Sequence, residues 1–304
     1  QYCITILIIF FFLILIVFNF KFYYNDERGG TMKIRFLGTA AAEGWPAIFC
    51  SCPACMKAKE LKGKNIRSRF SIMIDDAYKI DFPPDSFYHM IQHQLDYTKL
   101  KYLFISHPHT DHLASHEFEF RRKWFTNLRN DRNLHIYGWA KSLTKIKKGM
   151  VYSDENEPIY HSLKAFKKIE TPDFDVYPLP ANHMTPKDKP FIYLFVRKSD
   201  QKTFLSAHDT GYFFDEVWDF LKSFHIDVIS LDCTHGGGSS LNNHLGHQEV
   251  LKVKQKLEEL HIFNEGIFIV NHFSHNGKWS HEELESFFKP YHILVAYDGM
   301  EIEF

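Results

Sequence analysis

One short stretch of the sequence concentrates side chains that bind metals and protons. Residues 102–118 read YLFISHPHTDHLASHEF, in which an apolar run leads directly into His107, His109, Asp111 and His112. Imidazole and carboxylate together suit zinc, manganese or iron. Packing gives no reason to concentrate such groups after a buried strand. The spacing therefore predicts a metal site, in which His107 and His109 reach one ion while Asp111 and His112 face a second.

A second cluster of metal-binding side chains lies in FCSCPACMKA, where Cys50, Cys52 and Cys55 stand close together. The other two cysteines, Cys3 and Cys233, are isolated. An odd number of cysteines with three in one cluster is not the pattern of a secreted disulfide scaffold. We expect a reduced compartment, with the cluster bound to a metal.

The composition is that of an ordinary globular chain. Of its 304 residues, 45% are hydrophobic and 24% are charged, which is enough for a large core. The net charge of −1 gives no bulk electrostatic case for non-specific binding to nucleic acid. The 19 histidines are a high count, which favours metal chemistry.

Further candidate ligands follow other apolar strands. His183 ends FDVYPLPANH, Asp209 ends KTFLSAHD and His272 ends GIFIVNH, just as His107 follows LKYLFIS. In layered α/β folds the strand ends gather at one edge, and the loops there carry function. Segments far apart in the sequence can therefore converge on a single site.

The alternation of short strands and connecting segments predicts one α/β domain over residues 32–304. SIMID with YKIDF, and FIYLFVR with KTFLSAHD, are expected to form hairpins. Helices are expected between strands, at roughly 86–95, 114–129, 212–224, 246–261 and 280–288.

The first 31 residues differ from this domain. Residues 4–20 are apolar nearly throughout and close to the lower length limit of a membrane-spanning helix. A signal peptide would need a basic start and a small-residue cleavage site, and neither stands here. We favour a translated leader before a natural start at Met32, because residue 1 is Gln and ERGGTM fits a purine-rich ribosome-binding site ahead of ATG. The expected location is cytoplasmic, or membrane-anchored through residues 4–20 if that run is a true anchor.

The order of the ligand motifs resembles the metallo-β-lactamase superfamily, whose signature is H-x-H-x-D-H. PLPANHMT, FLSAHDTG and IVNHFSH match its later motifs. The resemblance implies an αββα sandwich of two mixed sheets flanked by helices. It also implies two divalent ions, zinc or manganese. One ion would be held by His107, His109 and His183, the other by Asp111, His112 and His272, with Asp209 bridging them. His208 and His275 are immediate alternatives to Asp209 and His272.

A narrower resemblance rests on the start of the domain. LGTAAAEGWPAIFCSCPACMKA is similar to the phosphodiesterase of the carbon–phosphorus lyase pathway of phosphonate degradation, and LDCTHGG, NNHLGH and AYDGMEIEF also match that family. The resemblance covers nearly all of residues 32–304 and implies a structural zinc on Cys50, Cys52, Cys55 and His275. Three thiolates and one imidazole complete a closed tetrahedral site. The pyrroloquinoline-quinone biosynthesis protein shares the cysteine pattern and is the nearest competing subfamily.

The resemblance implies a hydrolase that cleaves a small cyclic or diester phosphate by a metal-bound hydroxide. His244 of the NNH element would act near the leaving group, with His247 as the alternative, and Asp111 is counted as catalytic besides being a ligand. Asp81, at the end of YKIDF, is either a carboxylate that orients a metal-bound imidazole or a packing residue. His89, His116 and His235 are assigned no role.

Other functions stay open at this point. The same centre could hydrolyse a thioester, a lactone or a lactam, or the chain could be an accessory protein like the pyrroloquinoline-quinone biosynthesis protein. No nucleic-acid partner is expected, since no long basic insertion is present. A homodimer stays open, and a membrane is a partner only if residues 1–31 form a true anchor.

Overall fold

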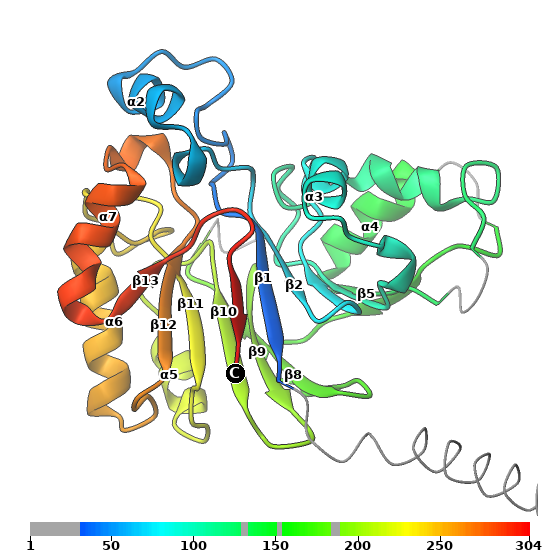
Figure 1. Cartoon of the computed structure of the whole chain (residues 1–304). Coiled ribbons are helices and arrows are strands. Elements are labelled where there is room, and N and C mark those ends of the chain that lie inside the picture. Colours follow the sequence, from blue (N-terminus) through cyan, green and yellow to red (C-terminus); the bar gives the residue numbers. More distant parts are fainter. Residues whose placement is uncertain (1–30, 129–132, 151–153, 184–188) are drawn as a thin grey trace, which may run out of the picture. The chain divides into compact units, whose positions relative to one another are not determined.

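Two mixed sheets form the centre of the computed structural model, which describes residues 31–128, 133–150, 154–183 and 189–304 (Figure 1). Of the leader or anchor predicted for residues 1–31, all but the last residue lies outside these ranges. Lys33–Phe304 forms one structural unit, while the division of the chain at residue 32 stays a prediction. Within the ranges given, every helix is too short or too polar to traverse a bilayer.

The first sheet has the strand order β14-β1-β2-β3-β4-β5-β6. Pairing is antiparallel from β14 to β3 and parallel from β3 to β6. The β2–β3 hairpin predicted from the sequence is confirmed. The strands are β1 (Lys33–Gly38), β2 (Ser71–Ile74), β3 (Tyr78–Ile80), β4 (Tyr102–Phe104), β5 (His135–Gly138), β6 (Ile159–Ser162) and β14 (Glu301–Glu303).

The second sheet repeats this sequence of pairings in the order β7-β8-β9-β10-β11-β12-β13. Pairing is antiparallel from β7 to β10 and parallel from β10 to β13. The β9–β10 hairpin is confirmed as well. The strands are β7 (Ile169–Glu170), β8 (Phe174–Pro180), β9 (Phe191–Arg197), β10 (Thr203–Ala207), β11 (Val228–Asp232), β12 (Ile267–Asn271) and β13 (Ile293–Val295).

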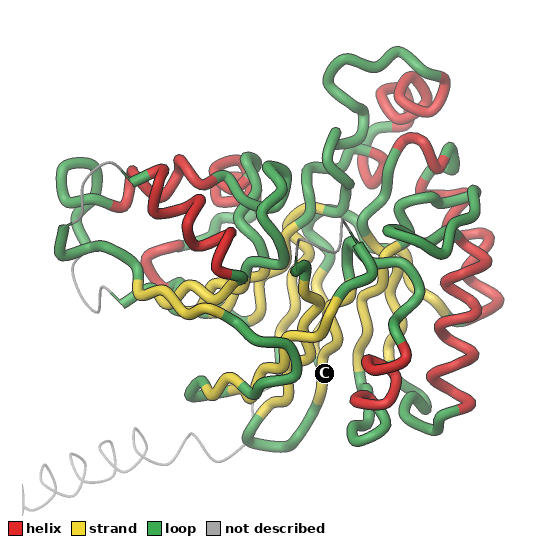
Figure 2. Tube along the Cα trace, turned by 180° about the vertical axis from the view of Figure 1, so that it is seen from behind, coloured by secondary structure: helices red, strands yellow, loops and turns green. Residues whose placement is uncertain are grey.

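Helices cover the outer face of each sheet, and the strands lie between them (Figure 2). The helices α3 and α4 lie beside the first sheet, and α5, α6 and α7 lie along the second (Figure 1). The predicted αββα sandwich is thereby confirmed. The helices are α2 (Pro53–Leu61), α3 (Ser86–Gln92), α4 (Ala140–Gly149), α5 (Asp215–Leu221), α6 (His247–Glu259) and α7 (His281–Phe288), with short 3₁₀ turns at Gly63–Asn65, Tyr97–Lys99, Ser115–Arg121, His275–Gly277 and Lys289–Tyr291.

Local sequence explains where the helices of the second half begin and which face they bury. Helix α6 buries Val250, Val253 and Leu257, which lie three and four residues apart and so share one stripe of the helix. Helix α7 begins with a capping box, in which the side chains of Ser280 and Glu283 each bind the other's backbone N–H.

The helix predicted over residues 114–129 is wrong. The structure has a 3₁₀ turn at Ser115–Arg121 followed by irregular chain. The apolar side chains here do not share one helical face, because Phe118 is buried while Trp124 and Phe125 are exposed. The backbone is also held elsewhere, since the Asp154 carboxylate accepts a hydrogen bond from the Lys123 N–H.

Aromatic side chains join the two sheets. The Phe104 ring of β4 lies edge-on to Tyr193 and Phe195 of β9, with ring centroids 5.5 Å and 5.2 Å away. The Tyr193 hydroxyl donates to the Ile105 carbonyl at 2.7 Å. Phe104 is fully buried, and such aromatic pairs add to the free energy gained by burial. The strand that leads into His107 is therefore fixed to the second sheet.

Replacing Phe104 with alanine should weaken this joint. We expect Phe104→Ala to lower the free energy of unfolding by about 3–5 kcal/mol, because it removes a fully buried ring and leaves a cavity. Phe120→Ala is the matched control, since Phe120 is 51% exposed, and it should change stability by no more than about 0.5 kcal/mol. Urea unfolding followed by circular dichroism measures both, and equal losses would contradict the assigned contact.

Candidate metal centre

The structure brings all seven predicted ligands of the catalytic centre together at one edge of the sandwich. They fall into two groups whose ligand atoms lie within 4.8 Å of one another. One group is His107, His109 and His183, and the other is Asp111, His112, Asp209 and His272. This division agrees with the two ligand sets implied by the resemblance, although their role as ligands stays a prediction.

Asp209 lies between the two groups. Its Oδ2 is 2.5 Å from His112 Nε2 and 3.8 Å from His107 Nε2, and its Oδ1 is 3.9 Å from His183 Nε2. A carboxylate that reaches histidines of both groups has the position of a bridging ligand. The alternative His208 is turned into the core, where its ring contacts Phe70 and its nitrogens bind two serine hydroxyls.

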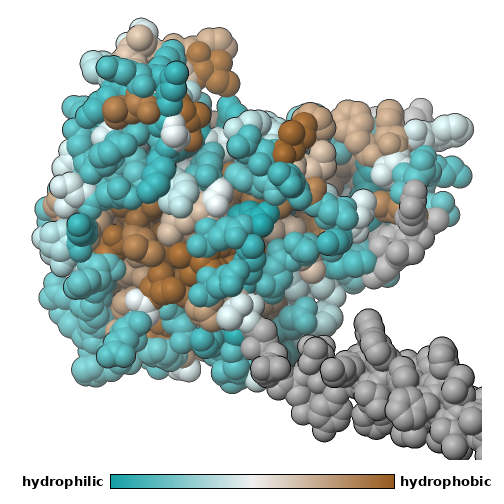
Figure 3. All heavy atoms as spheres, in the orientation of Figure 1, coloured by the Kyte–Doolittle hydropathy of each residue, from teal (hydrophilic) through white to brown (hydrophobic). Residues whose placement is uncertain are grey.

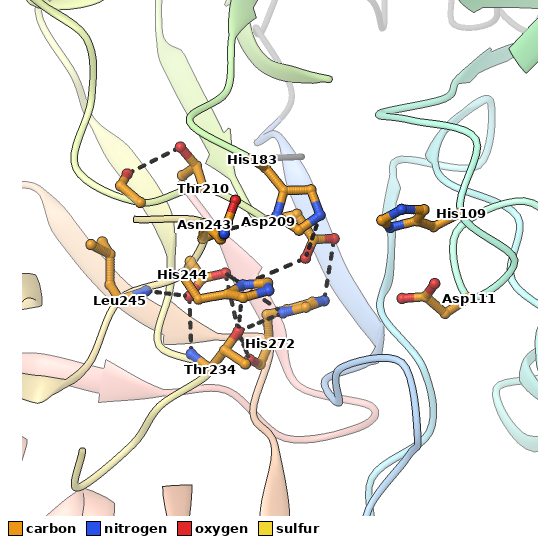
Figure 4. A network of polar contacts seen from close by, with 12 residues as sticks. His109, Asp111, His183, Asp209, Thr210, Thr234, Asn243, His244, Leu245 and His272 are labelled. Carbon is orange, nitrogen blue, oxygen red and sulfur yellow. Dashed lines mark hydrogen bonds and ion pairs between the residues drawn. The ribbon is translucent and has the colours of Figure 1, made fainter. Parts of the chain in front are cut away.

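The ligands come from both halves of the sandwich. His109 and Asp111, on the loop after β4, face His183, Asp209 and His272 of the second half across the site (Figure 4). Asp209 stands two residues beyond the end of β10 and His272 one residue beyond the end of β12, with φ of 48° and 63°. Residues other than glycine rarely adopt a positive φ, and those that do cluster at functional sites.

Four of the histidines are oriented in the same way. In each, Nδ1 faces a neighbouring oxygen that can accept its proton, the arrangement that gives Nε2 the lone pair needed for metal binding. The acceptors are Asp81 Oδ2 at 2.7 Å from His112, Ser106 Oγ at 2.9 Å from His107, Thr234 Oγ1 at 2.8 Å from His272 and the Asn243 carbonyl at 3.2 Å from His183.

Asp81 orients the first half of the centre. Besides binding His112, its carboxylate accepts hydrogen bonds from the Ser106 N–H and hydroxyl, both at 2.7 Å. It is fully buried and has a φ of 59°. Of the two interpretations left open by the sequence, the contacts therefore favour the orienting carboxylate.

Buried atoms without partners show that the side chains fit a metal. His112 Nε2, His183 Nε2, His272 Nε2 and Asp209 Oδ2 are buried and form no hydrogen bond among the described residues, although Asp209 Oδ2 lies within ion-pair distance of His112 and His272. Leaving a buried polar atom unpaired costs about 1–3 kcal/mol each. Because these atoms belong to the proposed ligands and face one another, divalent ions would satisfy all of them at once.

Electrostatics support the same conclusion. Burial opposes protonation of His112, yet Asp209, Asp111 and Asp81 raise its pKa well above the usual range. At His107 burial prevails and lowers the pKa, so this ring stays neutral and keeps a lone pair. The centre therefore holds excess negative charge beside neutral imidazole, the environment that a divalent cation requires.

Sequence reasoning missed Asp232. Its carboxylate, fully buried at the end of β11, lies 2.9 Å from His244 Nδ1 and accepts hydrogen bonds from the backbone N–H groups of Thr234 and Leu245. The signal was present, because Asp232 ends the apolar run IDVISLD just as the other candidates end theirs. Asp209, Asp232, His244 and His272 form a further group of potential ligands with atoms within 4.8 Å.

His244 adjoins the centre, and the alternative His247 does not. The His244 ring lies 4.9 Å from His183 and 5.7 Å from His272, between centroids. Burial lowers its pKa, but Asp232 outweighs this effect and raises it to about 9. His247 at the start of α6 instead packs against Trp279 and Phe287.

The three histidines without an assigned role occupy different surroundings. His116 is exposed, and its side chain lies beside Glu117. His89 is fully buried and bonds to Ser68 Oγ at 2.8 Å. His235 stands 6.0 Å from His244, between ring centroids.

The cysteine cluster meets His275 at a separate site. Sγ of Cys50 and Cys52 lie 3.7 Å and 3.3 Å from His275 Nδ1, and Cys55 completes a group whose ligand atoms lie within 4.8 Å of one another. Tetrahedral zinc with about 2.3 Å bonds to sulfur places its ligand atoms roughly 3.5–3.8 Å apart. None of these cysteines forms a disulfide.

Surrounding groups prepare this site for a cation. His275 Nε2 lies 3.3 Å from Glu43, which leaves Nδ1 to face the sulfur atoms. The backbone N–H of Cys55 lowers the pKa of Cys52 to about 6, with a further contribution from His275, whereas burial raises that of Cys55 to about 11. The four side chains therefore fit the predicted structural zinc, whose presence stays a prediction.

Comparison with known proteins agrees with this geometry. A family model described as a beta-lactamase superfamily domain matches residues 83–273, well over half of the chain. The match spans every predicted ligand of the catalytic centre, and the superfamily inferred from the sequence is thereby confirmed. A search of curated proteins found no match.

Solved structures share the fold. A structure described as a new diphosphatase from the PhnP family has a TM-score of 0.71 at 21% identity, covering 90% of this chain and 98% of that one. Zinc-bound PqqB from Methylobacterium extorquens has a TM-score of 0.69 at 12% identity, covering 90% and 100%. Human tRNase Z, short form, has a TM-score of 0.59 at 15% identity, covering 89% and 98%. At these identities the likeness concerns the fold.

Removing one ligand should remove metal without unfolding the chain. We expect His109→Ala to lower bound divalent metal by about one equivalent, because the ring is one of three ligands of its group. The far-ultraviolet circular dichroism should stay unchanged, since the ring lies outside the core. Elemental analysis of purified protein measures the loss, with His116→Ala as the control. Full metal content in His109→Ala would contradict the assignment.

Cys52→Ser tests the second site. The change should remove about one equivalent of zinc and lower the melting temperature by about 5 °C or more. Cys233→Ala is the control, because Cys233 is buried in the core and is not one of the four grouped ligand residues, and it should keep the full zinc content. If Cys52→Ser retains both zinc and melting temperature, the structural-zinc assignment fails.

Proposed function

Because the chain belongs to the beta-lactamase superfamily, whose members are metal-dependent hydrolases, we propose that it is a phosphodiesterase that hydrolyses a small cyclic or diester phosphate. The observation that carries the proposal is the position of His244 beside the two ligand groups, with Asp232 behind it. The proposed partner is a small phosphodiester, and no nucleic acid is proposed.

The Asp232 carboxylate determines which nitrogen of His244 can meet a substrate. It engages Nδ1 at 2.9 Å, so Nε2 is the nitrogen left for a reacting group. Thr234 supports this arrangement, because its hydroxyl lies 3.1 Å from both Asp232 Oδ2 and His244 Nδ1 and 2.8 Å from His272 Nδ1. The Thr234 hydroxyl thus positions both His244, the proposed proton donor, and His272, a proposed metal ligand.

A proton donor at this place suits an alkoxide leaving group. Hydrolysis of an alkyl phosphodiester expels a strongly basic oxygen, which leaves far more readily if it is protonated as the P–O bond breaks. A thioester expels a weakly basic thiolate and gains much less from such a donor. His244 therefore favours a phosphodiester over a thioester.

The chain supplies a fixed frame for this reaction. Two divalent ions, when bound by the ligand groups, would lower the pKa of a water molecule and neutralise charge on the phosphoryl oxygens. Lys145 of α4 donates to the Pro108 carbonyl at 2.7 Å and so holds the loop that carries His109 and Asp111. Asp81 and Ser106 fix the rings behind that loop.

The proposed subfamily is that of the carbon–phosphorus lyase phosphodiesterase. The support is the grouping of Cys50, Cys52, Cys55 and His275 one short turn from His272. Because one structure with this fold is described as a diphosphatase, diphosphates belong among the substrates to be tested. Lactones, lactams and the accessory role remain the alternatives.

A substrate panel tests the proposal. Protein loaded with zinc or manganese is assayed against bis(p-nitrophenyl) phosphate, methyl p-nitrophenyl phosphate, p-nitrophenyl phosphate, a diphosphate, a thioester, a lactone and a lactam. We expect the highest kcat/KM on a phosphodiester. A higher value on any other class would overturn the proposal in favour of that class.

The role of His244 can be separated from metal binding. His244→Ala should keep its metal and lower kcat by about 10²–10⁴-fold for alkyl leaving groups, but far less for p-nitrophenolate, which needs no proton. His247→Ala is the control and should leave both rates close to those of the unmodified protein. Equal losses for good and poor leaving groups would exclude His244 as the proton donor.

A further inference from the structure

The segment that carries the cysteines, residues 45–66, has a surface that neither metal site explains. We call it the cysteine arm. It follows β1 and contains α2, which lies above the strands in Figure 1. The chain just before the arm joins the edge of the sandwich that holds the candidate ligands, because the Ala41 N–H donates to the Phe273 carbonyl, next to His272.

The outermost turn of the cysteine arm has unusual residues. The Cys50 N–H donates to the Ala47 carbonyl at 3.1 Å, which closes a four-residue turn with Ile48 and Phe49 at its centre. Glycine, proline, asparagine, aspartate and serine dominate such positions. Here Ile48 is 69% exposed and Phe49 is fully exposed. Two large apolar side chains therefore stand at the apex of a surface turn.

The turn is held rigidly although its apex is apolar. On one side Trp45 is buried and pairs with Arg67 through both backbone groups. On the other side the Ala47 N–H donates to Cys55 Sγ at 3.3 Å. Since the flanking chain is fixed, Ile48 and Phe49 cannot fold back into the core, and presenting them to a partner costs little further ordering.

The cysteine arm is also basic. Its four lysines and one glutamate give a charge of +3, so the remainder of a chain with net charge −1 carries −4. Lys57 and Lys64 pair with Glu283 and Glu285 of α7. Lys59 and Lys62 form no ion pair among the described residues. Further exposed apolar side chains lie among the lysines, namely Met56, Leu61 and Ile66.

We propose that the cysteine arm docks onto an anionic lipid surface, with Ile48 and Phe49 entering the interface and Lys59 and Lys62 meeting the headgroups. Proteins bind anionic membranes through exposed apolar side chains that enter the interface and neighbouring lysines that contact the headgroups. Figure 3 shows apolar residues among hydrophilic ones in the upper part of the molecule, where the arm lies. The inference is independent of the substrate.

Charge argues against a second copy of the chain as the occupant. In a symmetric dimer the same patch meets itself, so a contact through the cysteine arm would bring Lys59 and Lys62 of one copy, which have no ion pair among the described residues, against the same lysines of the other. A bilayer that contains anionic lipid has the opposite sign and offers an apolar layer at the depth of the turn. Attraction to such a surface increases with each lysine that lies near it.

Hydrogen–deuterium exchange of the full chain tests the proposal. The protein is mixed with vesicles of phosphatidylcholine alone or with phosphatidylserine added. Because residues 4–20 are apolar and could bind vesicles themselves, the readout is confined to peptides that cover residues 45–52. We expect exchange there to slow at least about tenfold with the anionic vesicles only, and the effect to fade in 0.5 M salt.

Matched variants make the result specific. Ile48→Ser with Phe49→Ser should abolish the protection of these peptides while the zinc content stays unchanged. Phe87→Ser is the control, because Phe87 is 64% exposed on α3, and it should leave the protection intact. The proposal is overturned if anionic vesicles give no protection, if Phe87→Ser removes it equally, or if the same peptides are protected in a dimer without vesicles.

Discussion

The arrangement of the centre depends on how Nδ1 is engaged in four of the five candidate ligand histidines. An imidazole offers a lone pair to a cation only if its other nitrogen carries the proton. When Nε2 faces the cation, the proton is on Nδ1 and needs an acceptor there. Asp81, Ser106, Thr234 and the Asn243 carbonyl supply these acceptors. They stand on different segments, and the sheets must hold all of them in register. The fold of the domain thus holds these four hydrogen-bond acceptors in place around the centre.

Burying this much charge requires compensation. Asp81 and Asp232 are fully buried, and Asp209 nearly so. Each carboxylate has a defined counterpart, because Asp81 accepts three hydrogen bonds, Asp232 faces His244, and Asp209 lies among five imidazoles. Asp232 differs from the other two, since its partner is the ring proposed to release a proton. The Thr234 hydroxyl lies against Nδ1 of both His244 and the adjoining candidate ligand His272.

The sequence predicted the sandwich and the residues that gather at the candidate centre, but not all of the structure around them. His107, His183, Asp209 and His272 could be found because each stands two residues beyond a run of apolar residues, which is a local signal. Asp232 carries a similar signal but has no matching metal motif, and it was passed over. The 3₁₀ turn at Ser115–Arg121 depends on contacts with a distant segment, so its local composition was misleading. The pairing of β14 with β1 joins the two ends of the domain and leaves no trace in either segment.

The two sheets repeat one order of pairings, yet they contribute to the centre unequally. The first half offers four ligands on a single loop, whereas the second half offers one from each of three separate strand ends. An ion held by both halves acts as a cross-link between two leaves of one sandwich. Separation of the leaves would then require the metal to leave first. The bound metals would thus limit the rate at which the two sheets separate. Without metal, the sheets would separate transiently at the aromatic contacts around Phe104 while each sheet stays folded.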